Sequence, residues 1–117
     1  MEEFDIAIIG GGPAGIMAAI AASADLNVVL LEKNSSLGSK LLITGGGRCN
    51  ITNEKPIKKL LNSFHDKNFL KHSFYTFTNE MLLDLFRNRG LDFIVEDNNR
   101  VFPETEKSQD ILAILKY

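Results

Sequence analysis

The glycine-rich turn Gly10–Gly15 constrains this chain more than any other segment, because of what stands on either side of it. Before it lies Phe4–Ile9, a short apolar run rich in isoleucine, and after it lies Ile16–Ala22, an alanine-rich run typical of a helix. A strand, a G-x-G-x-x-G turn and a helix in this order are typical of dinucleotide-binding β-α-β units. The sequence therefore predicts a nucleotide site at the start of the first helix.

Each glycine of the turn has a predicted role. We expect Gly10 to let the chain turn off the strand where a Cβ would clash, and Gly12 to let the backbone approach a pyrophosphate. Gly15 would let the helix pack closely on the strand. Pro13 suits the first helical turn, where its missing N–H has no partner. The unpaired N–H groups and the dipole of the helix start favour an anion.

A second strand is predicted at Asn27–Leu31, and Glu32 follows it directly. Glu32 stands close to the roughly 20-residue spacing expected for the acid that binds a ribose. A carboxylate there would accept hydrogen bonds from both ribose hydroxyls and would repel a 2′-phosphate, so FAD or NAD is favoured over NADP. The alternative is a strand-terminal glutamate on a solvated edge.

Composition limits the remaining function classes. The 117 residues suffice for one small domain at most, and 44% apolar with 24% charged residues is typical of a globular protein. The net charge of −2 gives no electrostatic case for nucleic acid or an anionic membrane. No apolar run approaches the roughly 20 residues that span a bilayer. One cysteine excludes an internal disulfide framework, and the acidic N-terminus lacks the basic start of a secretory signal. We therefore expect a cytoplasmic protein.

The pattern of elements predicts an α/β fold: a β-α-β unit with parallel strands, followed by helices and a β-hairpin. Residues 33–53 read as a long polar and glycine-rich loop. Residues 56–75 read as helical with a break near His65-Asp66, and Glu80–Arg89 reads as a helix capped by Thr78 or Asn79. Residues 91–96 and 100–102 read as the hairpin.

The chain looks incomplete for such a fold. A helix is predicted over Ser108–Tyr117, and the sequence stops without a residue that would end it. A doubly wound sheet also needs more than two parallel strands. We therefore expect residues 1–117 to form a single partial Rossmann-like domain with an incomplete sheet, the N-terminal piece of a longer enzyme.

The segment Thr44–Asn53 is the second informative motif. Its consecutive glycines expose backbone N–H groups and permit close contact with a flat or anionic ligand, and Arg48 adds a positive charge. We interpret it as a second ligand-binding loop. The alternative is a tight structural turn with a solvated arginine.

This second motif carries a resemblance to a known family. Lys40–Asn50, followed by Thr52-Asn53, resembles the signature of the BaiN-type NAD(P)/FAD-dependent oxidoreductases, also called aminoacetone oxidase family FAD-binding enzymes. Arg100–Pro103 and the helix after it, with Asp110, fit that family as well. The resemblance covers essentially the whole chain, and full-length members are several times longer.

The resemblance implies bound FAD, with its pyrophosphate at the glycine turn and its adenosine ribose at Glu32. Lys33 would lie beside the adenine or ribose, and Lys40 and the Gly45–Asn50 loop would run along the cofactor toward the flavin. Ser39 departs from the family pattern, which is often basic there. The residues implied at the cofactor are Gly10, Gly12, Pro13, Ala14, Gly15, Glu32, Lys33, Lys40, Gly46, Arg48, Cys49 and Asn50.

Several of these side chains have alternative interpretations. Arg48 would either stabilise negative charge on a reduced flavin or form a loop-shaping salt bridge. Cys49 is interpreted as a small side chain packed beside the cofactor, because a redox pair needs a second cysteine. His65 and His72 lack the spacing of a helical metal pair, so no metal site is expected. A solvated face is the expectation for Lys55, Lys58, Lys59, Lys67 and Lys71.

The function predicted from these observations is the FAD-binding segment of a flavin-dependent oxidoreductase, enzymatically active at full length. It would act on a small-molecule substrate, with NAD(P)H as a candidate reductant and the remainder of its own chain as its partner. Its catalytic residues are not identified. The alternative is a truncated, non-catalytic nucleotide-binding module. A plain NAD-dependent dehydrogenase is less favoured, since it has no need of the 44–53 signature.

Overall fold

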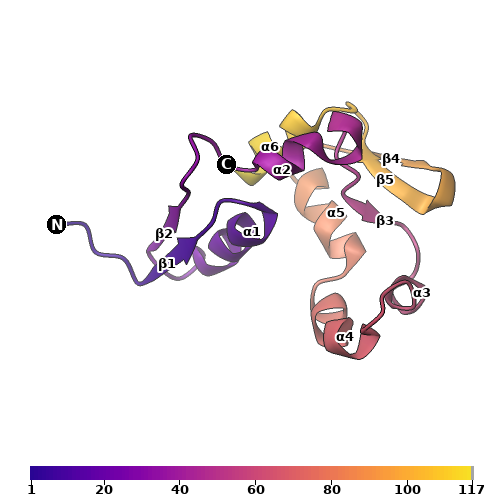
Figure 1. Cartoon of the computed structure of the whole chain (residues 1–117), viewed down its shortest axis with the longest axis horizontal. Helices are drawn as coiled ribbons and strands as arrows, with labels where there is room; N and C mark the ends of the chain where they lie inside the picture. The colour runs from indigo at the N-terminus through magenta and orange to yellow at the C-terminus, as the bar shows by residue number, and fades with distance from the viewer. Residues whose placement is uncertain (117) are drawn as a thin grey trace.

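The N-terminal part of the structure, a computed structural model that describes residues 1–116, is a parallel β-α-β unit. It consists of β1 (Ile6–Ile9), α1 (Pro13–Ala22) and β2 (Val28–Leu31) (Figure 1). The strands pair in parallel, with Ile6 opposite Val28. The predicted strand, turn, helix and strand are therefore confirmed.

The segment after β2 contains short helical elements where the sequence predicted only loop. Helix α2 (Ser39–Ile43) is followed by the 3-10 helix η1 (Thr44–Gly47) and by the two-residue strand β3 (Thr52–Asn53). The expectation of a loop over 33–53 was wrong for this part. Leu41 is buried in the core, and that burial stabilises a helix too short to form on its own.

Three helices follow, at α3 (Ile57–Leu61), α4 (Lys67–Thr76) and α5 (Asn79–Arg87). The predicted break falls between α3 and α4, where the Asp66 carboxylate caps α4. The Thr78 hydroxyl caps α5, so the first of the two residues that the sequence offered as its cap is the one used. Both caps satisfy an N–H group that a helix start leaves without a partner.

The second sheet is antiparallel and has the strand order β3-β5-β4. β4 (Phe93–Glu96) and β5 (Arg100–Pro103) form the predicted hairpin around the turn Asp97–Asn99. The last element, α6 (Ser108–Leu115), begins where the predicted helix begins. The end of that prediction, Tyr117, lies outside the described residues.

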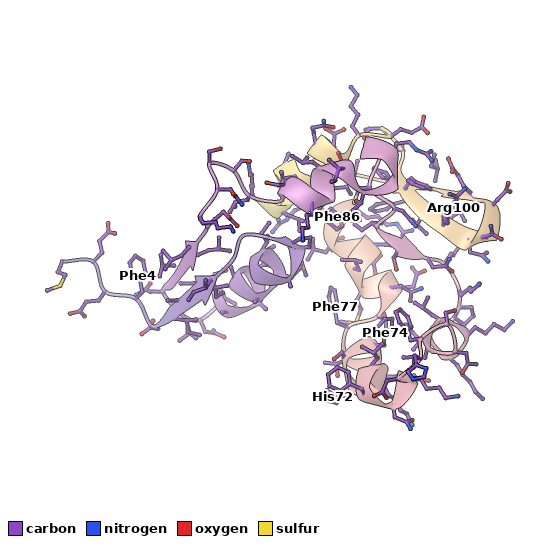
Figure 2. All side chains as sticks on the ribbon, viewed as in Figure 1. Phe4, His72, Phe74, Phe77, Phe86 and Arg100 are labelled. Atoms are coloured by element: carbon purple, nitrogen blue, oxygen red, sulfur yellow. The ribbon has the colours of Figure 1, made fainter. Side chains whose placement is uncertain are left out.

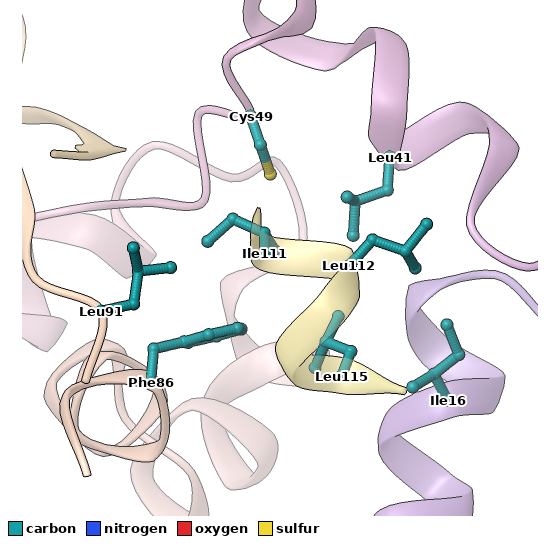
Figure 3. Close-up of a cluster of buried hydrophobic side chains, with 8 residues drawn as sticks. All are labelled: Ile16, Leu41, Cys49, Phe86, Leu91, Ile111, Leu112 and Leu115. Atoms are coloured by element: carbon teal, nitrogen blue, oxygen red, sulfur yellow. The ribbon is translucent and has the colours of Figure 1, made fainter. Parts of the chain in front are cut away.

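Helix α6 lies at the centre of the hydrophobic core, and Ile111 is completely buried. Figure 3 shows the cluster around it, to which α1, α2, α5 and α6 all contribute. Its buried members are Ile16, Leu41, Cys49, Phe86, Leu91, Ile111, Leu112 and Leu115. The β-α-β unit is thus joined to the rest of the molecule through α1 and α6 (Figure 1).

One face of the parallel sheet is apolar and uncovered. Ile8 faces α1, since its Cγ2 lies 3.5 Å from where a Cβ on Gly15 would stand. Side chains alternate along a strand, so Ile9 and its neighbour Leu31 lie on the opposite face, with 87% and 52% of their surface exposed. Among residues 1–116, no helix has the length and apolar character to cross a bilayer.

Candidate nucleotide-binding site

The turn between β1 and α1 depends on two glycines for different reasons. Gly10 has a φ of 103°, a conformation that L-residues rarely adopt, while a Cβ added there would meet nothing within 4 Å. Backbone conformation, and not the clash expected from the sequence, therefore requires this glycine. At Gly15 a Cβ would collide with the Gly10 carbonyl oxygen, so the predicted close packing of helix on strand is present.

The start of α1 offers unpaired donors around an open position. Gly12 is the N-cap, and a Cβ added there would meet no atom within 4 Å. Pro13 occupies the first turn. Within the described residues, the N–H groups of Gly12, Ala14 and Gly15 have no hydrogen-bond acceptor. Donors converging at a positive helix end are the groups that bind a phosphate.

Glu32 turns its carboxylate toward this glycine turn. Its Oε2 accepts a hydrogen bond from the Gly11 N–H at 2.7 Å, and its Oε1 accepts from the backbone and side-chain amides of Asn34, both at 2.8 Å. The N–H of Asn34, followed by that of Gly11, lowers the pKa of Glu32 below its usual value. The acid therefore stays ionised beside the turn and keeps acceptor capacity for further donors.

Gly11 and Asn34 were missed by the sequence analysis. A Cβ on Gly11 would collide with the Leu37 side chain and lie 3.0 Å from Glu32 Oε2, so a larger residue there would require the Leu37 side chain to move. The signal for Gly11 was present as the middle glycine of the run Gly10–Gly12. Asn34 had no signal beyond its position two residues after the acid.

A cavity of about 430 Å³ lies beside the helix start and brings the two sequence motifs together. Pro13 and Ala14 line it from the first motif, and Lys40, Cys49 and Asn50 line it from the second. Its other lining residues are Met17, Leu41, Thr44, Ile51, Leu82, Phe86, Ile111 and Leu115. Since Lys40 is the one charged residue in this lining, the cavity suits a mostly apolar group.

The residues that α5 and α6 contribute to this cavity were not predicted. Leu82 and Phe86 stand one helical turn apart on α5, and Ile111 and Leu115 do so on α6. Their spacing indicated a buried face of each helix. Nothing in the sequence indicated which buried faces would meet the two glycine motifs.

The second glycine motif is a tight turn. Gly45, Gly46 and Gly47 have φ of 57°, 68° and 84°, which favour glycine. A Cβ on Gly45 would stand 2.7 Å from the Asn50 N and 3.0 Å from the Phe102 ring, whereas Gly46 has open space around it. The loop is therefore packed on β5 at one glycine and open at the next.

Arg48 forms the loop-shaping salt bridge that the sequence left as one of two roles. Its Nη1 lies 2.6 Å from Glu96 Oε1 and 3.0 Å from Glu106 Oε1. The guanidinium carbon also lies 4.0 Å from the centroid of the Phe102 ring, a cation–π distance. Hydrogen bonds to Glu96 and then Glu106 raise the pKa of Arg48. These contacts tie the loop to the β4–β5 hairpin.

Cys49 is a buried thiol within the core. It is 4% exposed, has a φ of 61°, and points toward α6 (Figure 3). Burial raises the pKa of the Cys49 thiol, an effect partly offset by a hydrogen bond with Thr44. A protonated, enclosed thiol is a poor nucleophile. The geometry agrees with a small side chain packed at the cavity wall.

The structure thus gathers some of the predicted residues at the cavity and leaves others around it. Lys33 is exposed at the end of β2. The predicted residues that do not line the cavity are Gly10, Gly12, Gly15, Glu32, Lys33, Gly46 and Arg48. The glycine turn and Glu32 form one region, and the cavity with Lys40, Cys49 and Asn50 forms a second, with Pro13 and Ala14 between them.

Comparison with known proteins assigns this chain to a family. Residues 4–117 match the family described as HI0933-like protein Rossmann domain. The chain belongs to the HI0933-like Rossmann-domain family. This HI0933-like chain is 35% identical over 114 residues to a 3-dehydro-bile acid delta(4,6)-reductase of Clostridium scindens, and 34% identical over 118 residues to a ribosomal RNA dihydrouridine synthase of Escherichia coli.

The extent of these matches differs between relatives. The two alignments cover 95% and 98% of this HI0933-like chain but 27% and 28% of the relatives. A mitochondrial dihydrolipoyl dehydrogenase of Caenorhabditis elegans is 39% identical over 74 residues, which are 62% of this chain and 13% of that enzyme. The chain thus spans about a quarter of the length of the first two. Its relatives carry the names of oxidoreductases.

Proposed function

We propose that this chain is the FAD-binding segment of a flavin-dependent oxidoreductase. The observation that carries the proposal is the start of α1. The N–H groups of Gly12, Ala14 and Gly15 are unpaired there within the described residues, and the ionised Glu32 faces the same turn. The pyrophosphate of FAD needs such donors, and its adenosine ribose needs such an acceptor. Membership of a Rossmann-domain family supports the same assignment.

The residues present fit the cofactor in two regions. Gly12, Ala14 and Gly15 would donate to the pyrophosphate, and Glu32 would accept from the ribose. The apolar cavity lined by Lys40, Cys49 and Asn50 would take the less polar, flavin end of the molecule. Bound FAD supplies two-electron chemistry, while the protein orients it and excludes water.

The test is the cofactor content of the purified protein. We expect visible flavin absorption, release of FAD and not FMN on denaturation, and displacement of FAD by ADP. A colourless protein that takes up no added FAD would contradict the proposal. Binding of ADP with an affinity equal to that of FAD would favour the alternative, a nucleotide-binding module without a place for the flavin.

The reductant and the cellular location belong to the same proposal. We propose NAD(P)H as the electron donor, which anaerobic reduction of the bound flavin by NADH and NADPH in separate titrations would test.

We propose a cytoplasmic location, supported by the single, unpaired Cys49.

The substrate class is left open by the family, because its members carry different substrates in their names. One relative is named for a 3-dehydro-bile acid and another for ribosomal RNA. A small apolar substrate would suit the cavity of about 430 Å³. A polynucleotide is the second candidate, favoured by a basic surface on α3 and α4.

A further inference from the structure

The segment of residues 55–77, which carries α3 and α4, has a charge balance unlike that of the rest of the chain. It holds five of the thirteen lysines and arginines but one of the fifteen acids, Asp66. The carboxylate of Asp66 is engaged at the start of α4, where it accepts from the Phe69 N–H at 3.1 Å. The net charge of −2 for the whole chain conceals this basic segment.

Three of the five lysines of this segment line a groove of about 350 Å³ between α3 and α4. Lys58 lines it from α3, and Lys67 and Lys71 line it from α4, with Tyr75 one turn further along. Residues four apart share one face of a helix, so this face of α4 presents two cations and an aromatic ring in a row. The other lining residues are Leu61, Asn62 and Asn68.

These lysines have no acidic partner within residues 1–116. Every ion pair in the described part of the chain uses an arginine. The single polar contact of a groove lysine is a long one, 3.5 Å from Lys67 Nζ to Asn62 Oδ1. The positive charge of the groove is therefore free to attract an external anion.

The two aromatic residues at the end of α4 differ in their surroundings. Phe74 packs edge-on against Phe64, with ring centroids 5.3 Å apart, and so holds α4 against the segment after α3. Tyr75 is 52% exposed and faces the groove. Figures 1 and 2 show α3 and α4 together in a part of the molecule that projects away from α6 and α2.

We propose that the α3–α4 groove binds a single-stranded polynucleotide, with Lys58, Lys67 and Lys71 at its phosphates and Tyr75 stacked on a base. A row of cations beside an exposed aromatic ring is the arrangement that single-strand binders use. The side-chain amides of Asn62 and Asn68 add donors and acceptors suited to base edges.

An anionic membrane fits the groove less well. Membrane-surface helices place large apolar side chains beside their basic residues. The exposed Phe69 lies on the other side of α4 from Lys67, Lys71 and Tyr75. Leu61 in the groove is buried and Tyr75 is the only large exposed ring in its lining, so the groove lacks the exposed aliphatic anchor that insertion into lipid requires.

If the α3–α4 groove binds the substrate, the substrate class of the oxidoreductase is a single-stranded polynucleotide, and this part of the inference rests on the proposed function. Binding of the polynucleotide itself needs no flavin. Failure to bind RNA would leave the FAD assignment intact, and failure to bind FAD would leave the groove intact. The two results are therefore distinguishable in one protein preparation.

The experiment is a fluorescence anisotropy titration of the purified protein with labelled single-stranded RNA of about 20 nucleotides, longer than the site of one small domain. DNA of the same sequence is titrated in parallel. The variant Lys67→Ala/Lys71→Ala removes two groove lysines, and Lys107→Ala/Lys116→Ala removes two exposed lysines elsewhere as a charge-matched control. Tyr75→Leu tests stacking, and thermal unfolding of every variant checks its fold.

We expect the groove variant to weaken RNA binding roughly tenfold, while the control variant binds like the unaltered protein. Each phosphate contact contributes about −0.7 to the slope of log affinity against log salt, so the slope should fall from about −2 to about −0.7. Tyr75→Leu should weaken binding with an unchanged slope. RNA binding at least as tight as DNA binding supports RNA, and not DNA, as the polynucleotide that the groove binds.

Three results would overturn the proposal. The first is no RNA or DNA binding at low salt by the folded protein. The second is equal loss of binding in the groove and control variants, which would show diffuse attraction. The third is binding to vesicles of phosphatidylserine and phosphatidylcholine without binding to RNA, which would make the groove a membrane contact.

Discussion

At the scale of single residues, Glu32 connects the end of β2 to the glycine turn. Its two oxygens accept from Gly11 and Asn34, so the carboxylate holds the turn in place as well as facing the proposed ribose site. The sequence located this residue from its spacing alone. It did not show that a backbone N–H of the turn would be its partner.

Replacement of Glu32 by alanine should weaken FAD binding by about 10- to 100-fold, the range expected for lost hydrogen bonds to a charged group. Asp5→Ala is the matched control, because Asp5 Oδ2 accepts from the Asn27 N–H at 2.9 Å at the opposite end of the same strands. Calorimetric titration of both variants with FAD measures the effect. Equal affinities of the two variants would show that Glu32 does not contact the ribose.

The stability of the protein should depend on pH in part through the ionisation of Glu32. Its pKa is lowered in the folded protein, chiefly by the Asn34 N–H, so its contribution is complete above the unfolded pKa of about 4.3 and is lost as pH falls through the folded value. Thermal unfolding of the protein and of Glu32→Gln should therefore converge at acidic pH. Parallel curves across that range would contradict this linkage.

At the scale of elements, Arg48 joins the second glycine loop to the β4–β5 hairpin. Arg48→Lys keeps the charge but cannot reach Glu96 and Glu106 together while lying over Phe102. We expect the melting temperature to fall by a few degrees and the neighbouring Cys49 to react faster with a thiol reagent. Arg87→Lys, an arginine paired on α5, is the control. A Cys49 rate equal in both variants would show that the salt bridge does not hold the loop.

Alanine substitutions at two glycines of the first turn should differ in their effect on stability. Gly15→Ala places a Cβ against the Gly10 carbonyl oxygen and should destabilise the protein by about 1–3 kcal/mol or more. Gly12→Ala meets open space at a φ of −79° and should cost less than about 1 kcal/mol. Denaturant unfolding of both variants compares them. A Gly12 variant as unstable as the Gly15 variant would contradict this division.

The elements that could be predicted are those whose determinants are local. The turn Gly10–Gly15, the caps Asp66 and Thr78, and the hairpin turn Asp97–Asn99 each lie beside the element that they begin or connect. Helix α2 could not be predicted in the same way, because the burial of its apolar side depends on α6, far along the chain. The same holds for the walls that α5 and α6 give to the cavity.

At the scale of the whole molecule, the two glycine motifs meet because α1 and α2 both pack on α6. The charge of the molecule also differs between elements, because four of the nine lysines lie on α3 and α4 while the chain as a whole is acidic. The sequence shows this basic segment, but only the structure shows that three of its lysines line one groove. The central claim remains that the start of α1 binds the pyrophosphate of FAD.

The measurement that tests this claim most directly is calorimetric titration of the purified protein and of Gly12→Ala with FAD. A methyl group at the open position should block the approach of the pyrophosphate. We predict an affinity at least about tenfold lower, a difference of roughly 1.4 kcal/mol, in a variant whose unfolding transition is nearly unchanged. Equal affinity of the two proteins for FAD would contradict the account.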